Sequence, residues 1–422
     1  MASIFYALSL RTGQRSHLRS AVGEQLAVTV LMLPMLLALF QEFSLVSPLA
    51  NAFAIPLVSL VVVPLTLAGA FLDIASLLHL AHFVMLWVMA ALEWLAAWEG
   101  ATLQLHEPAA WTVILALVGA AWLLAPRGVP LRSLGVLWIA PLFAVAPARP
   151  AAGDAWLDVL EVGNGLAIVI RTATHAMVFD TGPRWNADSD SGSRIVVPFL
   201  RGEGVSSLDV MLVSHADDDH SGGARSIAAW HRPRWFLSSL QGGDALQGIG
   251  AASRPCAAGD AWRWDGVDFR VVHPAPAIYT ETTRRKENDR SCVLRVSTAR
   301  SSALLTGDAE ARSEMEMIGR REPLASQVLV VPHHGSKTSS TDRFIEAVAP
   351  SLGILSVGYM NRFHHPNGAV VARYDSRGIR LERTDERGAI HVVLPASATS
   401  RMEVSGQEES CRYWSERAAC HE

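Results

Sequence analysis

Five apolar stretches in the first third of the chain constrain its fold more than any other feature. They are Leu26–Phe40, Phe53–Leu72, Ala81–Trp98, Trp111–Ala125 and Leu134–Ala146. Residues 1–150 carry twelve charged side chains, whereas the remaining 272 residues carry 64, so the two parts differ threefold in charge density. A bilayer core needs about 20 apolar residues in a helix. The second and third stretches meet this length, and the others need their flanks. We therefore expect a helical membrane domain with about five transmembrane helices over residues 1–147.

Arginine positions predict the orientation of these helices. Arg11, Arg15 and Arg19 precede the first stretch, and Arg127 and Arg132 lie between the fourth and fifth. Basic residues favour the cytoplasmic side, so an inside start and five crossings put the rest of the chain outside. The C-terminal domain is therefore expected on the non-cytoplasmic side of a cell membrane. The short loop 73–80 has no basic residue, and a re-entrant stretch would reverse this result.

A Pro- and Ala-rich segment, 148–153, has the composition of a linker. The sequence beyond it has ordinary charge content and predicts a second domain over 154–398, with a tail over 399–422. Two helices are expected there, at Glu310–Arg320 and Ser340–Val348, which indicates layered α and β structure. The expected strands are Trp156–Val162, Leu166–Arg171, Ala176–Phe179, Val210–Val213, Phe269–Val272, Val293–Val296, Ala303–Leu305, Val328–Val331 and Gly353–Val357.

Four cysteines occur, at 256, 292, 411 and 420, and no two are spaced as in a zinc knuckle. Free buried thiols are one interpretation. In an oxidising compartment Cys411 and Cys420 could instead close a short C-terminal loop.

The expected strand Val210–Val213 runs into an unusual concentration of imidazoles and carboxylates. His215, Asp217, Asp219 and His220 follow it within seven residues. Such charge next to buried sequence is costly unless cations neutralise it, and these side chains are ligands for first-row metals. An ordinary polar loop with an N-cap Asp is the alternative.

Three more strand ends carry side chains of the same kind. Asp180 follows Val178-Phe179, Asp308 follows Leu304–Gly307, and His333-His334 follow Val328–Pro332. Each is weak evidence by itself, but in this order they indicate a metal site.

This order resembles the metallo-β-lactamase fold, an αββα sandwich. His215, Asp219 and His220 match the family signature HxHxDH, in which Asp217 stands where a second His is usual. Asp308 matches the metal-bridging Asp and His334 the final ligand His. His273 has plausible spacing for the intermediate His, although a structural role is equally open. Asp180 matches an Asp that orients ligands.

Together with the apolar part, the chain resembles the ComEC family of competence proteins over residues 20–395. The motifs that carry the resemblance include Gln25–Thr29, Phe43–Asn51, Leu160–Gly165, Asn288–Ser291, and Asn361 with His365-Pro366. Family members extend further at the N-terminus, so we expect a truncated membrane domain whose missing portion could lie on a separate chain. The resemblance implies transport of single-stranded DNA across the inner membrane for natural transformation. DNA, the lipid bilayer and other competence proteins are then the partners.

The resemblance also implies two divalent metal ions, Zn or Mn, in a domain that hydrolyses the strand left outside. His215, Asp217 and His334, with His273, are expected on one ion, and Asp219 and His220 on the other. Asp308 bridges them, and Asp219, His220 and Asp308 are the expected catalytic residues. A hydrolase with a non-DNA substrate and a channel with an inert metal domain remain the alternatives. The expected substrate-binding residues are His333, Ser336, Lys337, Asn288 and His365, and a helix N-terminus after Ser336 could bind phosphate or be an ordinary cap.

Overall fold

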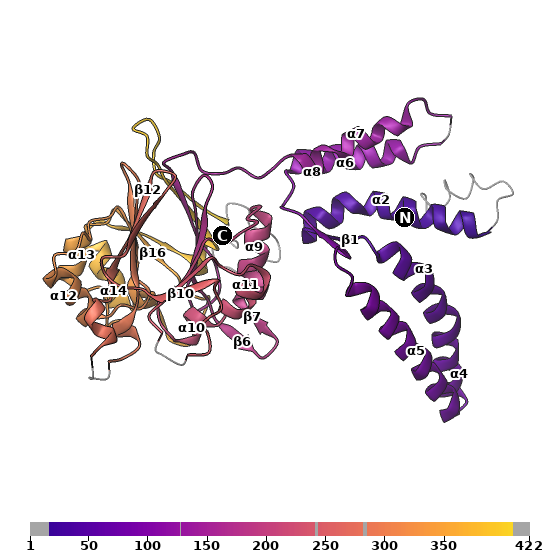
Figure 1. Cartoon of the computed structure of the whole chain (residues 1–422), viewed down its shortest axis with the longest axis horizontal. Helices are drawn as coiled ribbons and strands as arrows, with labels where there is room; N and C mark the ends of the chain where they lie inside the picture. Colours follow the sequence, from indigo (N-terminus) through magenta and orange to yellow (C-terminus); the bar gives the residue numbers. More distant parts are fainter. Residues whose placement is uncertain (1–16, 127, 241–243, 282–284, 408–422) are drawn as a thin grey trace. The chain divides into compact units, whose positions relative to one another are not determined.

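A computed structural model describes residues 17–126, 128–240, 244–281 and 285–407, and the chain divides into two compact units. One unit comprises residues 1–147 with 201–204, and the other comprises 148–200 with 205–422. Each unit is considered by itself (Figure 1). The proposed Cys411–Cys420 pair and the orienting residues Arg11, Arg15 and Arg127 lie outside the described residues.

Helices make up most of the first unit, joined by a small two-stranded sheet (Figure 1). All five apolar stretches fall on helical segments. Two segments are long and apolar enough to cross a membrane, Ser47–Phe71 and Ala75–Ala96, while Gln25–Phe40, Ala110–Leu123 and Arg132–Ala144 are shorter. The elements are α2 His17–Phe40, β1 Glu42–Ser44, α3 Ser47–Leu57, a π-helical turn Val58–Val62, α4 Val63–Phe71, α5 Ala75–Ala96, β2 Thr102–Gln104, α6 Ala110–Leu123, a 3-10 turn Arg132–Leu134, α7 Gly135–Ile139 and α8 Pro141–Ala144.

Helices α6 and α7 approach each other through small residues. A Cβ on Gly119 would lie 2.6 Å from the carbonyl oxygen of Gly135, and Ala116 and Ala120 are fully buried. Many large apolar side chains of the unit are exposed instead, among them Phe71 at 91%. Small residues between helices and large apolar residues outside are typical of helices that pack in lipid.

Two sheets form the framework of the second unit (Figure 1). The eight-stranded sheet has the order β10-β9-β8-β5-β4-β3-β18-β19, and the seven-stranded sheet has the order β11-β12-β13-β14-β15-β16-β17. The strands of the first sheet are β3 Ala155–Val159, β4 Ala167–Arg171, β5 Ala176–Thr181, β8 Val210–Val213, β9 Trp235–Ser238, β10 Ala252–Pro255, β18 Ile390–Leu394 and β19 Glu403–Gly406. Those of the second are β11 Ala261–Trp264, β12 Val267–His273, β13 Val293–Ser297, β14 Ser302–Leu305, β15 Val328–Val330, β16 Leu352–Leu355 and β17 Arg380–Arg383.

Alternation along the strands divides the interior into three apolar layers. On β5, Met177 and Phe179 face the core between the sheets, whereas Ala176 and Val178 face helices on the outer side. Both sheets are covered outside, so the architecture is αββα, as the sequence predicts. The covering helices are α9 Val197–Gly202 and α11 Ala224–Trp230 on the first sheet, and α12 Ala311–Gly319, α13 Asp342–Val348 and α14 Gly368–Asp375 on the second.

All nine strands and both helices expected from the sequence are present, but two expectations were wrong. The tail does not begin at 399, because β19 pairs with β18 and Val404 packs against the core between the sheets. The helix expected at Ser340–Val348 is α13, which begins at Asp342 with Thr341 as its N-cap. Cys256 and Cys292 are not free thiols, because they form a buried disulfide.

Parallel strands bring the sequence motifs together. β5 and β8 are parallel in one sheet, and β14, β15 and β16 are parallel in the other. Because the carboxyl ends of parallel strands meet at one edge of a sheet, Asp180 and His215 leave the first sheet close together. Asp308 and His334 leave the second sheet in the same way.

Candidate metal centre

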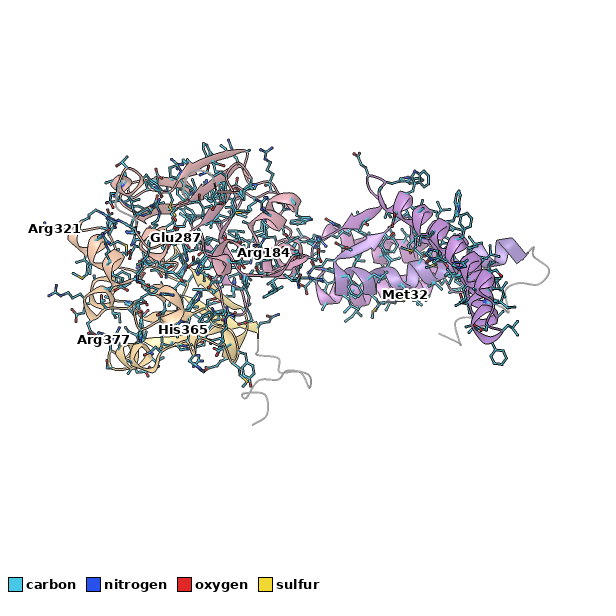
Figure 2. All side chains as sticks on the ribbon, turned by 90° about the horizontal axis from the view of Figure 1, so that it is seen from below. Met32, Arg184, Glu287, Arg321, His365 and Arg377 are labelled. Atoms are coloured by element: carbon cyan, nitrogen blue, oxygen red, sulfur yellow. A yellow bond between two sulfur atoms is a disulfide. The ribbon has the colours of Figure 1, made fainter. Side chains whose placement is uncertain are left out.

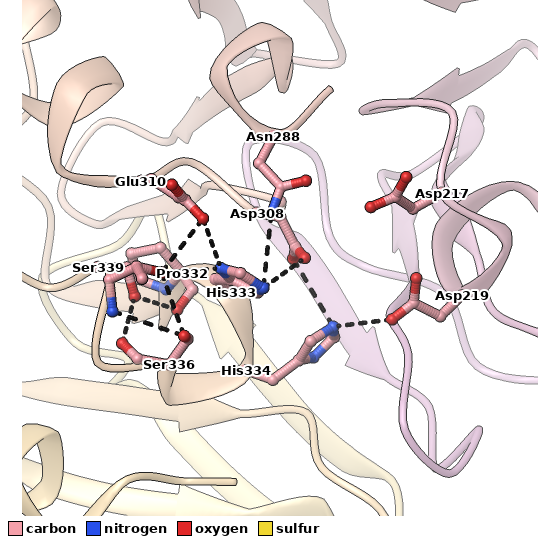
Figure 3. A network of polar contacts seen from close by, with 12 residues as sticks. Asp217, Asp219, Asn288, Asp308, Glu310, Pro332, His333, His334, Ser336 and Ser339 are labelled. Atoms are coloured by element: carbon pink, nitrogen blue, oxygen red, sulfur yellow. Dashed lines mark hydrogen bonds and ion pairs between the residues drawn. The ribbon is translucent and has the colours of Figure 1, made fainter. Parts of the chain in front are cut away.

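Two groups of side chains lie close enough to hold a metal ion. His215, His220 and Asp308 form one group, and Asp219, His220 and His334 form the other. Within each group the ligand atoms all lie within 4.8 Å of one another. Figure 3 shows Asp217 and Asp219 on one side of the centre, facing Asp308 and His334 on the other. Sequence stretches more than 80 residues apart therefore converge here.

Asp308 belongs to the first group, and its carboxylate also reaches His334 of the second group. Oδ1 lies 3.0 Å from Nε2 of His220 and 3.6 Å from Nε2 of His334. Oδ2 lies 3.9 Å from Nε2 of His215. A carboxylate that faces both ways is the arrangement a bridging ligand requires.

The remaining contacts connect the loop after β8 to both groups. Nε2 of His334 lies 3.5 Å from Oδ2 of Asp219 and 3.2 Å from Nε2 of His220. Nε2 of His215 lies 3.4 Å from Oδ2 of Asp217. His334 therefore groups with Asp219 and His220, and not with His215 and Asp217 as the sequence interpretation had it.

Each of these imidazoles is oriented through its other nitrogen. Nδ1 of His220 contacts Asp180 at 2.7 Å, and Nδ1 of His334 contacts the carbonyl oxygen of Ser356 at 2.8 Å. Nδ1 of His215 lies 3.0 Å from the Ser214 hydroxyl. Such contacts fix the ring and leave Nε2 facing the centre. Asp180 itself also accepts hydrogen bonds from the backbone and side chain of Ser214.

The carboxylates and imidazoles shift one another's ionisation. Burial lowers the pKa of His220, but the charges of Asp308 and Asp180 outweigh it and raise that pKa well above the usual value. Burial raises the pKa of Asp308, but His220 and His334 bring it well below its usual range. Burial also raises the pKa of Asp219, but the contact with His334 outweighs this effect and lowers that pKa to about 2. The carboxylates are thus held ionised, as metal ligands must be.

Two buried atoms of the centre form no well-aligned hydrogen bond. Within the described part of the chain, Nε2 of His215 and Oδ1 of Asp308 are buried in this way, although each faces an atom of opposite charge type, at 3.4 Å in Asp217 and 3.0 Å in His220. A buried polar atom without a partner costs about 1–3 kcal/mol. A cation at the centre would satisfy both atoms, so the residues present fit a divalent metal site.

A strained turn presents the histidine pair. His333 and His334 have φ of 52° and 53°, which is uncommon for residues with a side chain, and Gly335 follows at 75°. A Cβ on Gly335 would lie 2.8 Å from the Cβ of Pro366, so glycine is needed there. Because strain of this kind persists where the surroundings impose it, the turn supports a functional role for both imidazoles.

His333 lies at the edge of the centre, in a polar network of its own (Figure 3). Its Nε2 is 3.5 Å from both Oδ2 of Asp308 and Nδ2 of Asn288. Its Nδ1 is 3.2 Å from the Thr338 hydroxyl and 3.5 Å from Oε1 of Glu310. Two of the expected substrate-binding residues, His333 and Asn288, are therefore adjacent to the metal ligands.

Other expected site residues lie elsewhere. His273 is in neither group, since its Nδ1 contacts the carbonyl of Ser291 and its Nε2 lies 3.7 Å from Glu316. The hydroxyl of Ser336 bonds with Thr338, and Lys337 is exposed. His365 is closer, with its ring centroid 6.1 Å from that of His333.

Two residues that contact the histidine pair were missed in the sequence analysis. Ser356 orients His334 through a backbone carbonyl, which any residue could supply, so no side-chain pattern marks it. Glu310 does carry a signal, because it comes two residues after Asp308 at the same strand end.

Comparisons with known proteins agree with this arrangement. The family model described as Competence protein matches residues 1–130, and that of the Metallo-beta-lactamase superfamily matches residues 160–359. The chain therefore carries a competence-protein domain followed by a metallo-β-lactamase domain. The family resemblance found in the sequence is confirmed, as is the metallo-β-lactamase fold of the second unit.

Two curated relatives are competence proteins. Competence protein ComA of Neisseria gonorrhoeae is 36% identical over 379 residues, which are 89% of this chain and 52% of that protein. ComE operon protein 3 of Bacillus subtilis is 27% identical, over 92% of this chain and 54% of that protein. The chain thus spans about half the length of these relatives. Among solved structures, the metallo-beta-lactamase fold protein YhfI from Bacillus subtilis has a TM-score of 0.35 at 10% identity, over 54% of this chain and 95% of that one.

Proposed function

We propose that this chain is a membrane component of DNA uptake whose second unit is a metal-dependent phosphodiesterase that degrades the DNA strand left outside. The observation that carries the hydrolase assignment is the position of Asp308, a carboxylate of the first group of potential ligands that also reaches His334 of the second group. The competence domain and the names of the relatives support DNA as the substrate.

The geometry supports a revised division of the ligands between two ions. Asp219, His220 and His334 would hold one ion with Oδ1 of Asp308. His215 and Asp217 would hold the other with Oδ2 of Asp308. Asp217 in place of a histidine makes the second position richer in oxygen, which favours Mn over Zn there.

Divalent ions at these positions would supply Lewis acidity for both the attacking and the leaving oxygen in hydrolysis of a phosphodiester. The protein's part is to hold the imidazoles rigid and the carboxylates ionised. Asp180, Ser214 and the Ser356 carbonyl fix the three imidazoles. His333 and Asn288 lie beside Asp308 and would bind the phosphate that approaches it.

The membrane arrangement we propose has five crossings and a non-cytoplasmic second unit. Five helical segments support it, although α6 with 14 residues is about 21 Å long and needs its flanks to cross. The buried Cys256–Cys292 disulfide supports an oxidising surrounding for the second unit. Labelling with a membrane-impermeant reagent at an introduced cysteine in the second unit tests the side. Labelling only after the membrane is permeabilised would refute it.

The hydrolase proposal is tested with the full chain purified in detergent. We expect Mn²⁺- or Zn²⁺-dependent cleavage of DNA by the wild type, and loss of at least a hundredfold in Asp308→Asn. Asp218→Asn is the matched control, because Asp218 lies between the candidate ligands Asp217 and Asp219 in the sequence but is exposed and faces Arg184. It should retain wild-type activity.

The alternatives give different results in the same assay. Metal-dependent cleavage of a small phosphodiester without cleavage of DNA would indicate another substrate. No metal-dependent hydrolysis of either substrate would indicate an inert domain within a channel, and the proposed hydrolase function would be wrong.

A further inference from the structure

An exposed aromatic loop lies next to the histidine pair. We define it as Gly358–Pro366, which follows β16. β16 is the parallel neighbour of β15, whose end carries His333 and His334, so the loop leaves the sheet at the same edge as the metal ligands. Figure 2 labels His365, whose ring centroid lies 6.1 Å from that of His333.

The loop displays large apolar side chains that are half exposed or more. Met360 is 83% exposed, and Tyr359 and Phe363 are about half exposed. Three large apolar side chains within five residues at the rim of a polar site are more than the scattered exposure of an ordinary surface.

Hydrogen bonds hold this display in place. The side-chain amide of Asn361 donates to the carbonyls of Gly358 and His365, at 3.1 and 2.7 Å. Its oxygen accepts from the backbone N–H of His365 at 3.0 Å. The aromatic rings are therefore preorganised, which lowers the entropy cost of binding a ligand.

A series of neighbouring rings extends from the exposed loop to the metal centre. The guanidinium of Arg362 lies 4.8 Å from the centroid of the Phe363 ring. Phe363 and His365 are stacked, with centroids 6.0 Å apart and an interplanar angle of 14°. His365 then lies 6.1 Å from His333, which contacts Asp308. Nδ1 of His365 is buried without a hydrogen-bond partner among the described residues.

We infer that the loop Gly358–Pro366 binds an unpaired base of single-stranded DNA on Phe363 and so selects single strands for the metal centre. The inference rests on the proposed function. Aromatic rings beside a cation are what proteins use to bind single strands without sequence preference, because every base has a π-face. Arg362 supplies the charge for the backbone. Bases in a duplex are already stacked and must be extruded first, so the duplex is disfavoured.

Binding to Phe363 variants tests this inference. The full chain in detergent, with EDTA to prevent cleavage, is titrated into a fluorescein-labelled oligodeoxyadenylate and into a duplex of equal length. We expect Phe363→Ala to raise the Kd for the single strand at least about fivefold, with the duplex changed less than twofold. Phe363→Tyr keeps the ring and should bind like the wild type.

Trp235→Ala is the matched control. Trp235 is also exposed and has Arg254 over its ring at 5.7 Å, but it opens β9 opposite Val210, at the sheet edge away from His215. It should bind both DNAs like the wild type. Unchanged single-strand binding by Phe363→Ala, or equal loss for single strand and duplex, would overturn the inference.

A parallel assay separates this inference from the proposed function. Hydrolysis of bis(p-nitrophenyl) phosphate with Mn²⁺ reports on the metal centre without a DNA strand. If the wild type cleaves this substrate but Phe363→Ala binds DNA as the wild type does, only the proposed role of the loop is refuted. A wild type without metal-dependent hydrolysis would refute the proposed function, whatever Phe363→Ala does to binding.

Discussion

Apolar side chains point in opposite directions in the two units. In the two-sheet unit, Phe179 and Phe269 lie between the sheets and are essentially inaccessible to solvent. In the helical unit many large apolar residues are exposed, and Gly119 and Gly135 lie at the contact between α6 and α7. The first arrangement is typical of a unit that folds in water, and the second is typical of helices that pack in lipid.

The largest expected difference between the units comes from removing one aromatic ring from each. Phe179→Ala should lower the free energy of unfolding by about 3–5 kcal/mol, because it leaves a cavity between the sheets. Phe71→Ala, at a 91% exposed site, should change it by less than about 0.5 kcal/mol in detergent. Denaturant unfolding of the full chain measures both. An equal loss of unfolding free energy in Phe71→Ala and Phe179→Ala would mean that Phe71 is covered by protein.

The disulfide gives a second difference between the units. Cys256 and Cys292 join segments of the two-sheet unit 36 residues apart. Replacing both by alanine should lower the stability of that unit by about 2–4 kcal/mol, because the unfolded chain gains freedom. Thermal unfolding, with and without reductant, measures the loss. Reductant should lower the unfolding midpoint of the wild type more than that of the double variant. Equal shifts in the two proteins would mean that the disulfide does not form.

Glycine substitutions test the interior of the helical unit. A Cβ on Gly135 would lie 2.4 Å from the carbonyl of Gly119, so Gly135→Ala should cost about 1–3 kcal/mol. Gly23→Ala is the control, because a Cβ there meets nothing within 4 Å, and it should be neutral or slightly stabilising. Midpoints of thermal unfolding in the same detergent compare the two. A tolerated Gly135→Ala would indicate that α6 and α7 are further apart.

The smallest expected effect concerns an ion-paired group at the surface of the two-sheet unit. His273, 3.7 Å away, and Arg285 lower the pKa of Glu316 to about 2 from an ordinary 4.5. A lowered carboxyl pKa stabilises the fold above pH 4.5, and this contribution is lost as pH falls toward 2. Glu316→Gln should therefore be slightly less stable than the wild type at pH 7, by under about 1 kcal/mol. The gap should close below pH 3 in unfolding measured across pH, and a gap that widened in acid would contradict the assignment.

The sequence predicted strands well where burial produces a pattern. Val210–Val213 and Ala303–Leu305 are continuous apolar runs, and both are strands with nearly the expected bounds. β10, Ala252–Pro255, was missed because it is a short and exposed edge strand without an apolar run. β18 pairs with β3 more than 200 residues away, and no local signal carries such a pairing.

The sequence predicted which residues form the site better than it predicted which of them would bind the same ion. His215, Asp219, His220, Asp308 and His334 all follow strands, and the fold brings them together. Which ion His334 would serve depends on how the Ser356 carbonyl orients its ring, a contact between distant segments. His273 shares the strand-end pattern yet faces Glu316, because the pattern does not reveal which way a side chain points.

Metal content tests the central claim most directly. The full chain, loaded with Mn²⁺ or Zn²⁺ and dialysed, is analysed by mass spectrometry of its metals. The account predicts two ions per chain for the wild type and for Asp218→Asn, and one or none for Asp308→Asn. A wild type that retains no metal, or an Asp308→Asn variant that keeps two ions, would contradict it.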